Sequence, residues 1–365
     1  MKLLIKSIPY LFCVCVLISC SVKKTMIKEN DLFLYKGRVA KIDDAKAYLI
    51  GSGASVSFRF NGKKCAFYLS SIDSWEHYNY FVVEVDGNYK GRFKIEKGTA
   101  QSFFVEEALD TIHNVSIYKA TEAANGKILF NGEKIDSLVK NELTYKKKIE
   151  FIGNSITCGM GNDMSIPCHT GEWFDQHNAY WAYGPILARK LNADFLLSSV
   201  SGIGMYRNWN DENEPNMPQV YENLSLNTDT TTAYTTDYQP DLVSICLGTN
   251  DLSDGDGIKK RLPFNEEKYM SNYIRFIQLL YKRYPKTSIV LLSSPMLSGE
   301  KNATLLRCLK KIIKGCNEDN KHKPIQLFEF PAMQPRGCDY HPSIEDHKLM
   351  ALQMEVTFKQ LLNEK

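Results

Sequence analysis

The sequence predicts an α/β fold: a three-layer α/β/α domain with a parallel five-stranded sheet, preceded by a β-sandwich of the jelly-roll type. Two patterns carry this prediction. Short alternating strands fill residues 31–138, and from residue 149 onward apolar strand-like runs alternate with amphipathic helical stretches. The polar residues 139–148 separate the two patterns. We therefore expect a sandwich domain at 31–138, a linker at 139–148 and an α/β domain at 149–365.

Alternating apolar residues predict the strands of the sandwich. Val56–Phe60 and Phe81–Val85 alternate, and the Asp86-Gly87 pair after the second run is a hairpin signal. Further strands are expected at Phe103–Val105 and Asn114–Tyr118. Short strands at even spacing with Gly and Asn between them are typical of a sandwich.

Strands and helices alternate in the second domain. The strands are expected at 149–152, 195–200, 242–247, 289–292 and 325–330. The helices are expected at 178–191, 266–284, 301–314 and 343–362. The helix at 266–284 carries apolar residues on one face at helical spacing, which we interpret as core packing. Ser343 is the expected N-cap of the last helix, with Asp346 in the capping-box position.

Length and composition are those of an ordinary globular protein. The chain has 365 residues, of which 44% are hydrophobic and 24% charged, and its formal net charge is +3. A chain of this length is expected to form about two domains. These values exclude a disordered or fibrous chain, and the sequence has no basic run of the size that binds nucleic acid.

The N-terminus has the features of a targeting segment. An apolar stretch over residues 8–18 follows two lysines and is too short for an ordinary transmembrane helix. Leu17-Ile18-Ser19-Cys20 resembles a bacterial lipobox, in which the cysteine is lipidated. We expect a lipoprotein signal peptide at 1–19, a tether at 20–30, and an exported lipoprotein of the bacterial cell envelope anchored through Cys20. An uncleaved anchor or a simple secretory signal is the alternative.

Seven cysteines lie after Cys20, an odd number, so at least one stays free unless chains are cross-linked. Cys158 and Cys338 each flank a candidate site segment, and either could pair with Cys168 or Cys316. The cysteines and histidines show no zinc-site spacing, and no metal is expected.

A serine follows the first strand of the second domain. The strand ends at Gly153, Ser155 comes two residues later, and Gly159 closes the turn. Such a turn delivers a hydroxyl to the carboxyl edge of a parallel sheet, where open α/β folds place their sites. We expect both glycines to adopt backbone angles that a side chain would forbid. A plain turn with a capping serine is the alternative.

Three later segments supply the other groups that an acyl-transfer serine needs, namely a base and donors for the oxyanion. Gly202 follows the second strand and could offer a backbone N–H. Asn250 follows the third strand and could offer a side-chain amide. His341 precedes the last helix, where a general base could face Ser155. Each segment taken alone is also consistent with an ordinary loop.

Together these segments resemble the sequence blocks of the SGNH (GDSL-type) hydrolases. Gly153-Asn154-Ser155 resembles block I, Gly202 block II, Gly248–Asp251 block III and His341-Pro342 block V, in the family's order. The resemblance implies an ester hydrolase with no metal and no organic cofactor.

The resemblance also assigns roles to these residues. Ser155 would be the nucleophile and His341 its base. The backbone N–H groups of Ser155 and Gly202 and the amide of Asn250 would form the oxyanion hole. The family's usual triad acid lies three residues before the histidine, where this chain has a cysteine. Asp339 is the nearest acid, and in an extended segment it would lie on the same side as His341; otherwise a backbone carbonyl orients the imidazole and the site is a dyad.

The order of the two domains narrows the resemblance to carbohydrate esterase family 2. Enzymes of that family remove acetyl groups from plant polysaccharides such as xylan and glucomannan, and some use a Ser–His dyad. The resemblance implies an acetyl-enzyme on Ser155, with an acetylated polysaccharide or oligosaccharide as partner and the membrane contacted only through the lipid anchor. Trp173 and Trp209 follow the first and second strands, and we expect them to bind sugar rings, with ordinary packing as the alternative.

Other functions stay open from the sequence alone. The chain could be a lipase-like or sialate O-acetyl esterase, or it could transfer acetyl to a sugar instead of water. A catalytically silent carbohydrate-binding surface protein is the alternative from another class. The four site residues, each after a different predicted element, argue against this last reading.

Overall fold

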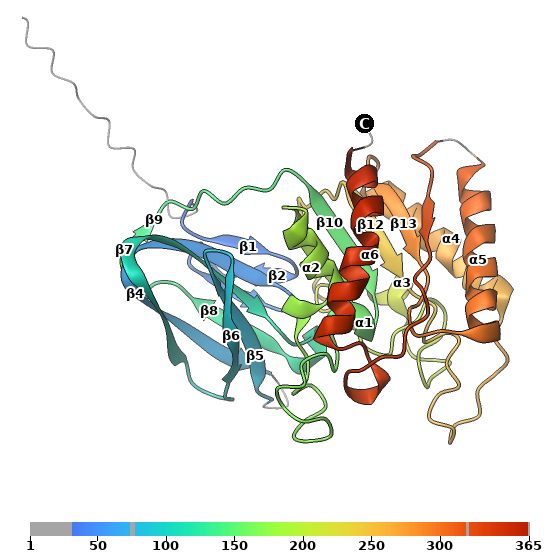
Figure 1. Ribbon diagram of the computed structural model, residues 1–365, viewed down its shortest axis with the longest axis horizontal. Coiled ribbons are helices and arrows are strands. Elements are labelled where there is room, and N and C mark those ends of the chain that lie inside the picture. The colour runs from blue at the N-terminus through green and yellow to red at the C-terminus, as the bar shows by residue number, and fades with distance from the viewer. Residues whose placement is uncertain (1–30, 74–76, 319–320, 364–365) are drawn as a thin grey trace, which may run out of the picture.

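Two sheets form the frame of the protein, one in each domain (Figure 1). The computed structural model describes residues 31–73, 77–318 and 321–363. The first sheet is antiparallel and has nine strands, in the order β2-β3-β8-β4-β7-β5-β6 with β1 and β9 both paired to β4. These strands are β1 Leu34–Lys36, β2 Val39–Lys41, β3 Lys46–Leu49, β4 Ser55–Ile72, β5 Asn79–Val85, β6 Asn88–Ile95, β7 Gln101–Lys119, β8 Lys127–Asn131 and β9 Leu138–Val139.

Two long strands, β4 and β7, run through this sheet where shorter strands were predicted. Their register shifts between Gly62 and Lys64. Before the shift the hydrophobic core residues of β4 are Val56, Phe58 and Phe60, and after it they are Cys65, Phe67 and Leu69. The change from even to odd positions shows that a bulge lets one strand serve the same core along its whole length. The predicted Asp86-Gly87 hairpin joins β5 to β6, and both residues have positive φ.

The second sheet is parallel and has five strands in the order β11-β10-β12-β13-β14, which confirms the predicted fold class. Its strands are β10 Lys148–Gly153, β11 Asp194–Ser199, β12 Leu242–Cys246, β13 Ser288–Leu292 and β14 Gln326–Phe328. Phe151 packs in one core cluster and Ile152 in another, because successive side chains of a strand point to opposite faces. Both faces of this sheet are therefore covered.

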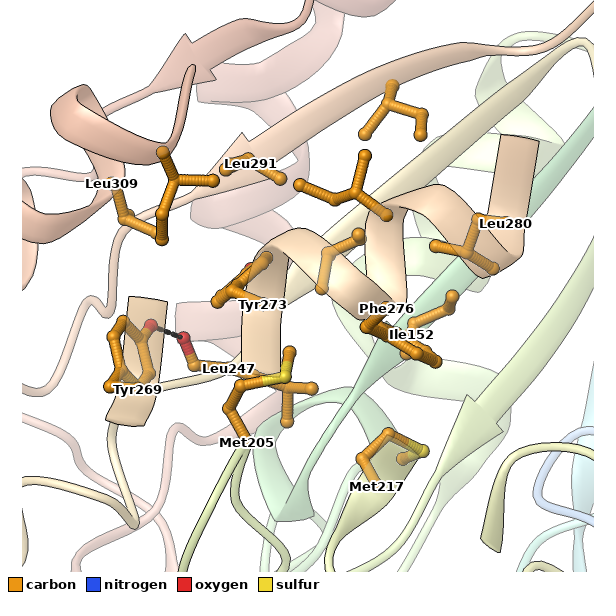
Figure 2. Close-up of a cluster of buried hydrophobic side chains, with 14 of the residues drawn as sticks. Ile152, Met205, Met217, Leu247, Tyr269, Tyr273, Phe276, Leu280, Leu291 and Leu309 are labelled. Carbon is orange, nitrogen blue, oxygen red and sulfur yellow. Dashed lines mark hydrogen bonds between the residues drawn. The ribbon is translucent and has the colours of Figure 1, made fainter. Parts of the chain in front are cut away.

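Helices on each face complete the three layers. The α-helices are α1 Ser155–Cys158, α2 Tyr183–Lys190, α3 Met217–Val220, α4 Glu266–Arg283, α5 Gly299–Asn317 and α6 Ile344–Asn363. Helices α2 and α6 share a core cluster with Phe151, whereas α4 and α5 share one with Ile152. Figure 2 shows the second cluster, where the Tyr269 hydroxyl of α4 donates to the Leu247 carbonyl at 2.8 Å. The capping box predicted for α6 is present: Asp346 N–H donates to Ser343 Oγ at 3.2 Å, and Ser343 N–H donates back to Asp346.

The two domains share a core. Tyr80 and Tyr118 of the sandwich belong to the same cluster of buried residues as Phe151. Arg38, only 1% exposed, reaches from the sandwich to the carbonyls of Asn223 and Tyr221 at 2.8 and 2.9 Å. The sandwich is thus fixed against the α/β domain by both apolar and polar contacts. Within the described ranges, no helix has the length and apolarity to span a bilayer.

Candidate active site

Ser155 is the first residue of the short helix α1, immediately beyond the carboxyl end of β10. The Asn154 side chain caps this helix by accepting the Ile156 N–H at 3.1 Å. Gly159 ends it with φ of 76°, as predicted. Gly153 does not have a positive φ, so its predicted role is wrong; a Cβ there would lie 2.0 Å from Thr157 Oγ1, and glycine is needed for space. The strand-to-helix turn thereby presents the Ser155 hydroxyl at the sheet edge.

His341 contacts this hydroxyl. Its Nε2 lies 2.8 Å from Ser155 Oγ, although the two residues are 186 positions apart. Its Nδ1 lies 2.7 Å from the backbone oxygen of Asp339. A carbonyl can only accept, so Nδ1 carries the proton and Nε2 is free to take one from the serine. Burial lowers the pKa of His341, which keeps the ring neutral near pH 7 and so able to accept a proton.

The Asp339 carboxylate does not orient the imidazole, which corrects the triad prediction in favour of its alternative. Residues 338–340 form a 3-10 turn with φ of 50° at Asp339 and 59° at Tyr340, so the segment is not extended. The carboxylate instead faces His169, whose Nδ1 lies 3.6 Å away. The backbone carbonyl therefore replaces the acid, and the geometry is that of a Ser–His dyad.

A disulfide between Cys168 and Cys338 fixes the turn that carries this carbonyl. It is one of the pairings that the sequence left open, and neither Cys158 nor Cys316 takes part in it. Cys338 N–H also donates to the Gly161 carbonyl at 2.8 Å, and His341 N–H donates to the Cys338 carbonyl at 3.0 Å. The histidine loop is thus tied to the loop that follows α1.

The donors predicted for the oxyanion lie in two further loops of the α/β domain. Gly202 occupies the third position of a turn from Val200 to Ile203, with φ of 77°. Asn250 uses one amide N–H to donate to the Ile203 carbonyl at 2.7 Å, which leaves the other available. In the described part of the chain, the backbone N–H groups of Ser155 and Gly202 have no acceptor. An oxyanion hole requires N–H donors that the protein itself leaves unused.

Asp251 is a site residue to which the sequence analysis gave no role. Its fully buried carboxylate accepts the backbone N–H groups of Met205, Tyr206 and Arg207, with the Tyr206 bond at 2.8 Å. Burial raises the pKa of this carboxyl to about 6. The residue fixes the segment that follows the Gly202 turn. Its position next to Asn250 was the one available sequence signal.

Both candidate sugar-binding tryptophans keep 46% of their surface exposed. Trp173 packs edge-on against His177, with ring centroids 4.8 Å apart. Trp209 lines a cavity of about 510 Å³ together with Gly202 and Ile203. A larger cavity of about 590 Å³, lined by Tyr206 and Phe276 among others, contains none of the predicted site residues. Within the described ranges, no three His, Cys, Asp or Glu side chains are grouped as metal ligands.

Comparison with known families matches two models to the two domains. The carbohydrate esterase 2 N-terminal model matches residues 35–140. The GDSL-like lipase/acylhydrolase family model matches residues 151–344, which is more than half of the chain and includes Ser155 and His341.

Similar proteins and structures share both domains. The acetylxylan esterase / glucomannan deacetylase of Cellvibrio japonicus is 29% identical over 281 residues, covering 75% of this chain and 76% of that protein. The cellulase/esterase CelE of Acetivibrio thermocellus is 29% identical over 344 residues; the match covers 93% of this chain but only 40% of that protein. The structure of a family two carbohydrate esterase from Clostridium thermocellum with cellohexaose has a TM-score of 0.80 at 28% identity, covering 90% of this chain and 99% of that one.

Proposed function

Because this chain belongs to the GDSL-like lipase/acylhydrolase family and carries a carbohydrate esterase 2 N-terminal domain, we propose that it is a serine esterase that removes O-acetyl groups from carbohydrate. The proposed substrate is an acetylated plant polysaccharide such as xylan or glucomannan, as the name of the Cellvibrio relative suggests. The observation that carries the proposal is the chain of contacts from Ser155 Oγ through His341 to the Asp339 carbonyl.

The reaction proceeds in two steps. Ser155 Oγ attacks the acetyl carbonyl carbon while His341 Nε2 takes its proton. The oxyanion is stabilised by the N–H groups of Ser155, Gly202 and Asn250. His341 then protonates the sugar oxygen as it leaves, and an acetyl-enzyme remains. Water, deprotonated by His341, then attacks this ester. The Ser155 oxygen leaves and takes the proton back from His341, which releases acetate and regenerates the free serine.

The Asp339 carbonyl supports each transfer. It accepts the Nδ1 proton at 2.7 Å, so it fixes the tautomer and interacts favourably with the imidazolium that forms. A carbonyl carries only a partial negative charge, which stabilises the imidazolium less than a carboxylate would. The exposed faces of Trp173 and Trp209 are suited to stacking against the sugar rings that flank the acetyl group.

Acetate release from acetylated xylan, acetylated glucomannan and 4-nitrophenyl acetate tests this function. We expect release from all three by the chain from residue 21 onward, and its loss by about 10⁴-fold or more in Ser155→Ala at unchanged melting temperature. A folded wild type that releases no acetate would overturn the proposal. Adding a free sugar acceptor and analysing the products separates hydrolysis from acetyl transfer.

We also propose that the protein is an exported lipoprotein held at the bacterial envelope through Cys20. The motif Leu17-Ile18-Ser19-Cys20 supports this, although Cys20 lies outside the described residues. Mass spectrometry of the N-terminal peptide after expression in a bacterium should find a lipidated cysteine, and Cys20→Ala should abolish both the lipid and membrane fractionation. An unmodified Cys20 in the membrane fraction would contradict this proposal.

A further inference from the structure

The turn that carries Gly202 is held by the other domain. Ser201, the residue before Gly202, donates its backbone N–H to Glu122 Oε2 at 2.8 Å. Its hydroxyl donates to the second oxygen, Oε1, of the same carboxylate. Glu122 belongs to the sandwich, just after β7, and lies 79 positions from Ser201 in the sequence. One carboxylate therefore binds Ser201 at two points.

The position of Ser201 controls the direction of the Gly202 N–H. The two residues are joined by one planar peptide unit, so holding Ser201 leaves few rotations by which the Gly202 N–H can turn. On the other side of the turn, the Gly202 carbonyl accepts the Trp209 N–H at 2.7 Å, and a Cβ on Gly202 would meet only Trp209 Cβ, at 3.9 Å. The Glu122 contacts restrain the Ser201 side of the turn, which precedes the Gly202 N–H.

Glu122 is itself rigidly placed. It is 2% exposed, and its neighbours Lys119 and Thr121 are fully buried. The Lys119 ammonium donates to the Glu122 carbonyl at 2.5 Å and to the carbonyl and hydroxyl of Thr121 at 3.1 and 3.0 Å. Three acceptors match the three N–H bonds of an ammonium, so a positive charge lies beside the buried carboxylate. The Glu122 N–H donates to Asn125 Oδ1 at 3.2 Å and fixes the backbone.

Glu122 has the correct charge state for this contact. Both of its carboxylate oxygens accept hydrogen bonds from Ser201, which suits the ionised form. His177 Nδ1 lies 3.6 Å from Oε1, but burial lowers the pKa of His177 to about 3, so this ring is neutral. Burial raises the pKa of Glu122 and lowers that of Lys119 to about 7, while each group favours the charged form of the other and the two Ser201 bonds favour the Glu122 carboxylate.

From this geometry we infer that Glu122 is a positioning residue of the active site, whose carboxylate sets the Ser201–Gly202 turn so that the Gly202 N–H faces the oxyanion. The sandwich thereby completes the catalytic apparatus of the α/β domain. This inference rests on the proposed esterase function. It predicts a loss of transition-state stabilisation, not of substrate binding, when the contact is removed.

Steady-state kinetics on 4-nitrophenyl acetate test the inference, with active sites titrated by a fluorophosphonate. Glu122→Ala should lower kcat per titrated site by about 10- to 100-fold, with KM changed less than about threefold. One oxyanion donor contributes a factor of about 10²–10³ to kcat, and a misdirected donor should lose part of that factor. Ser201→Ala keeps the backbone hydrogen bond to Glu122, so its kcat should fall by a smaller factor than that of Glu122→Ala. Glu122→Gln, which still accepts from Ser201 N–H, should restore most of the rate.

The affinity of a boronic acid that forms a tetrahedral adduct on Ser155 measures how well the oxyanion hole binds a transition-state analogue. The inhibition constant of this boronic acid should rise across the variants in parallel with the fall in kcat. The double variant Glu122→Ala/Ser201→Ala should be no slower than Glu122→Ala, because both changes break the same contact. Glu150→Gln is the matched control: Glu150 is another fully buried carboxylate, roughly 10 Å along β10 from its carboxyl end, and this change should lower stability without altering kcat.

The outcomes separate the two proposals. An active wild type whose Glu122→Ala and Ser201→Ala variants keep full kcat per titrated site and full boronic acid affinity would overturn this inference alone. If Glu122→Ala does not fold, Ser201→Ala decides. A Ser201→Ala variant with unchanged kcat and unchanged boronic acid inhibition constant would overturn the positioning role of Glu122. A wild type that hydrolyses no ester overturns the proposed function and this inference with it.

Discussion

Two buried carboxylates accept hydrogen bonds along the boundary between the domains, and they differ in what their partners do. Glu150, in the middle of β10, accepts from Ser198 at 2.6 Å and Tyr221 at 2.9 Å, and Arg38 of the sandwich donates to the same Ser198 hydroxyl at 3.0 Å. Glu122, at the active edge, accepts from Ser201 beside a backbone N–H that has no acceptor in the described chain. All of these Glu150 partners are protein groups, whereas the Glu122 contact lies next to an N–H group that is free to bind a ligand.

This difference separates stability from catalysis. Around Glu150 every partner is a protein group, so removing one partner leaves a buried polar group or charge without a replacement partner. Around the Gly202 turn the donors have no protein acceptor and are free to bind an oxyanion when it forms. Changes in the first region should therefore alter the free energy of unfolding, and changes in the second should alter kcat.

The largest effect on stability is expected from Arg38→Met. The side chain is 1% exposed and donates to two backbone carbonyls and Ser198, so its removal leaves these acceptors without their donor. It also takes away one of the two guanidinium groups, with that of Arg283, that favour the ionised form of Glu150. We expect a loss of about 3–5 kcal/mol in the free energy of unfolding, measured by chemical denaturation, with kcat of the folded fraction unchanged.

Arg59→Met is the control for this prediction. Arg59 pairs with Glu142, whose side chain is 69% exposed, and such pairs contribute roughly 0–1 kcal/mol. Arg38→Met as stable as Arg59→Met would show that the Arg38 network does not hold the domains together.

A large effect on catalysis is expected from Asn250→Ala. The change removes one donor to the oxyanion, which should lower kcat by about 10²–10³-fold, and the lost bond to the Ile203 carbonyl should cost only about 1 kcal/mol of stability. Kinetics on 4-nitrophenyl acetate and thermal denaturation measure the two quantities. Asn272→Ala removes a similar amide bond, to the Met205 carbonyl at 3.1 Å, and should leave kcat unchanged. Equal rates for the two variants would contradict the role of Asn250.

Activity and stability should also respond differently to acid. His341 must be neutral to accept a proton, and burial lowers its pKa, so kcat/KM should rise with pH through a midpoint below 6.5. His347 is fully buried and accepts the backbone N–H of Tyr183, the first residue of α2, at 3.2 Å. Burial lowers the pKa of His347 to about 3. The unfolded chain binds that proton near pH 6.5 and the folded chain near pH 3, so stability should fall as pH drops across this window. A pH profile of kcat/KM beside one of melting temperature measures both, and a kinetic midpoint above 7 would contradict the first.

The smallest effect is expected from Asp339→Asn. The imidazole is held by the backbone oxygen of this residue, and asparagine tolerates φ of 50°, so the carbonyl should stay in place. We expect kcat within about threefold of wild type. A fall in kcat of about 10⁴-fold, the size that follows removal of a triad acid, would show that the Asp339 carboxylate takes part in catalysis.

Local patterns were enough to predict much of the protein. The period of apolar residues predicted all five strands of the parallel sheet, and Ser343 and Asp346 predicted the cap of α6. The candidate residues Ser155, Gly202, Asn250 and His341 were proposed because parallel strands deliver their carboxyl ends to one edge. Each of these inferences depends on residues only a few positions apart, or on a rule that holds for any such sheet.

The tertiary structure decided the contacts between distant segments. Whether the carbonyl or the carboxylate of Asp339 faces His341 depends on backbone angles that are set where the Cys168–Cys338 disulfide ties two loops together. The need for glycine at Gly153 comes from the nearby Thr157 side chain, not from the backbone angle. The Glu122–Ser201 contact joins residues of two domains, and no period or spacing in the sequence signals it. Such contacts arise from how the domains pack, and the sequence alone does not reveal packing between segments that are far apart in the chain.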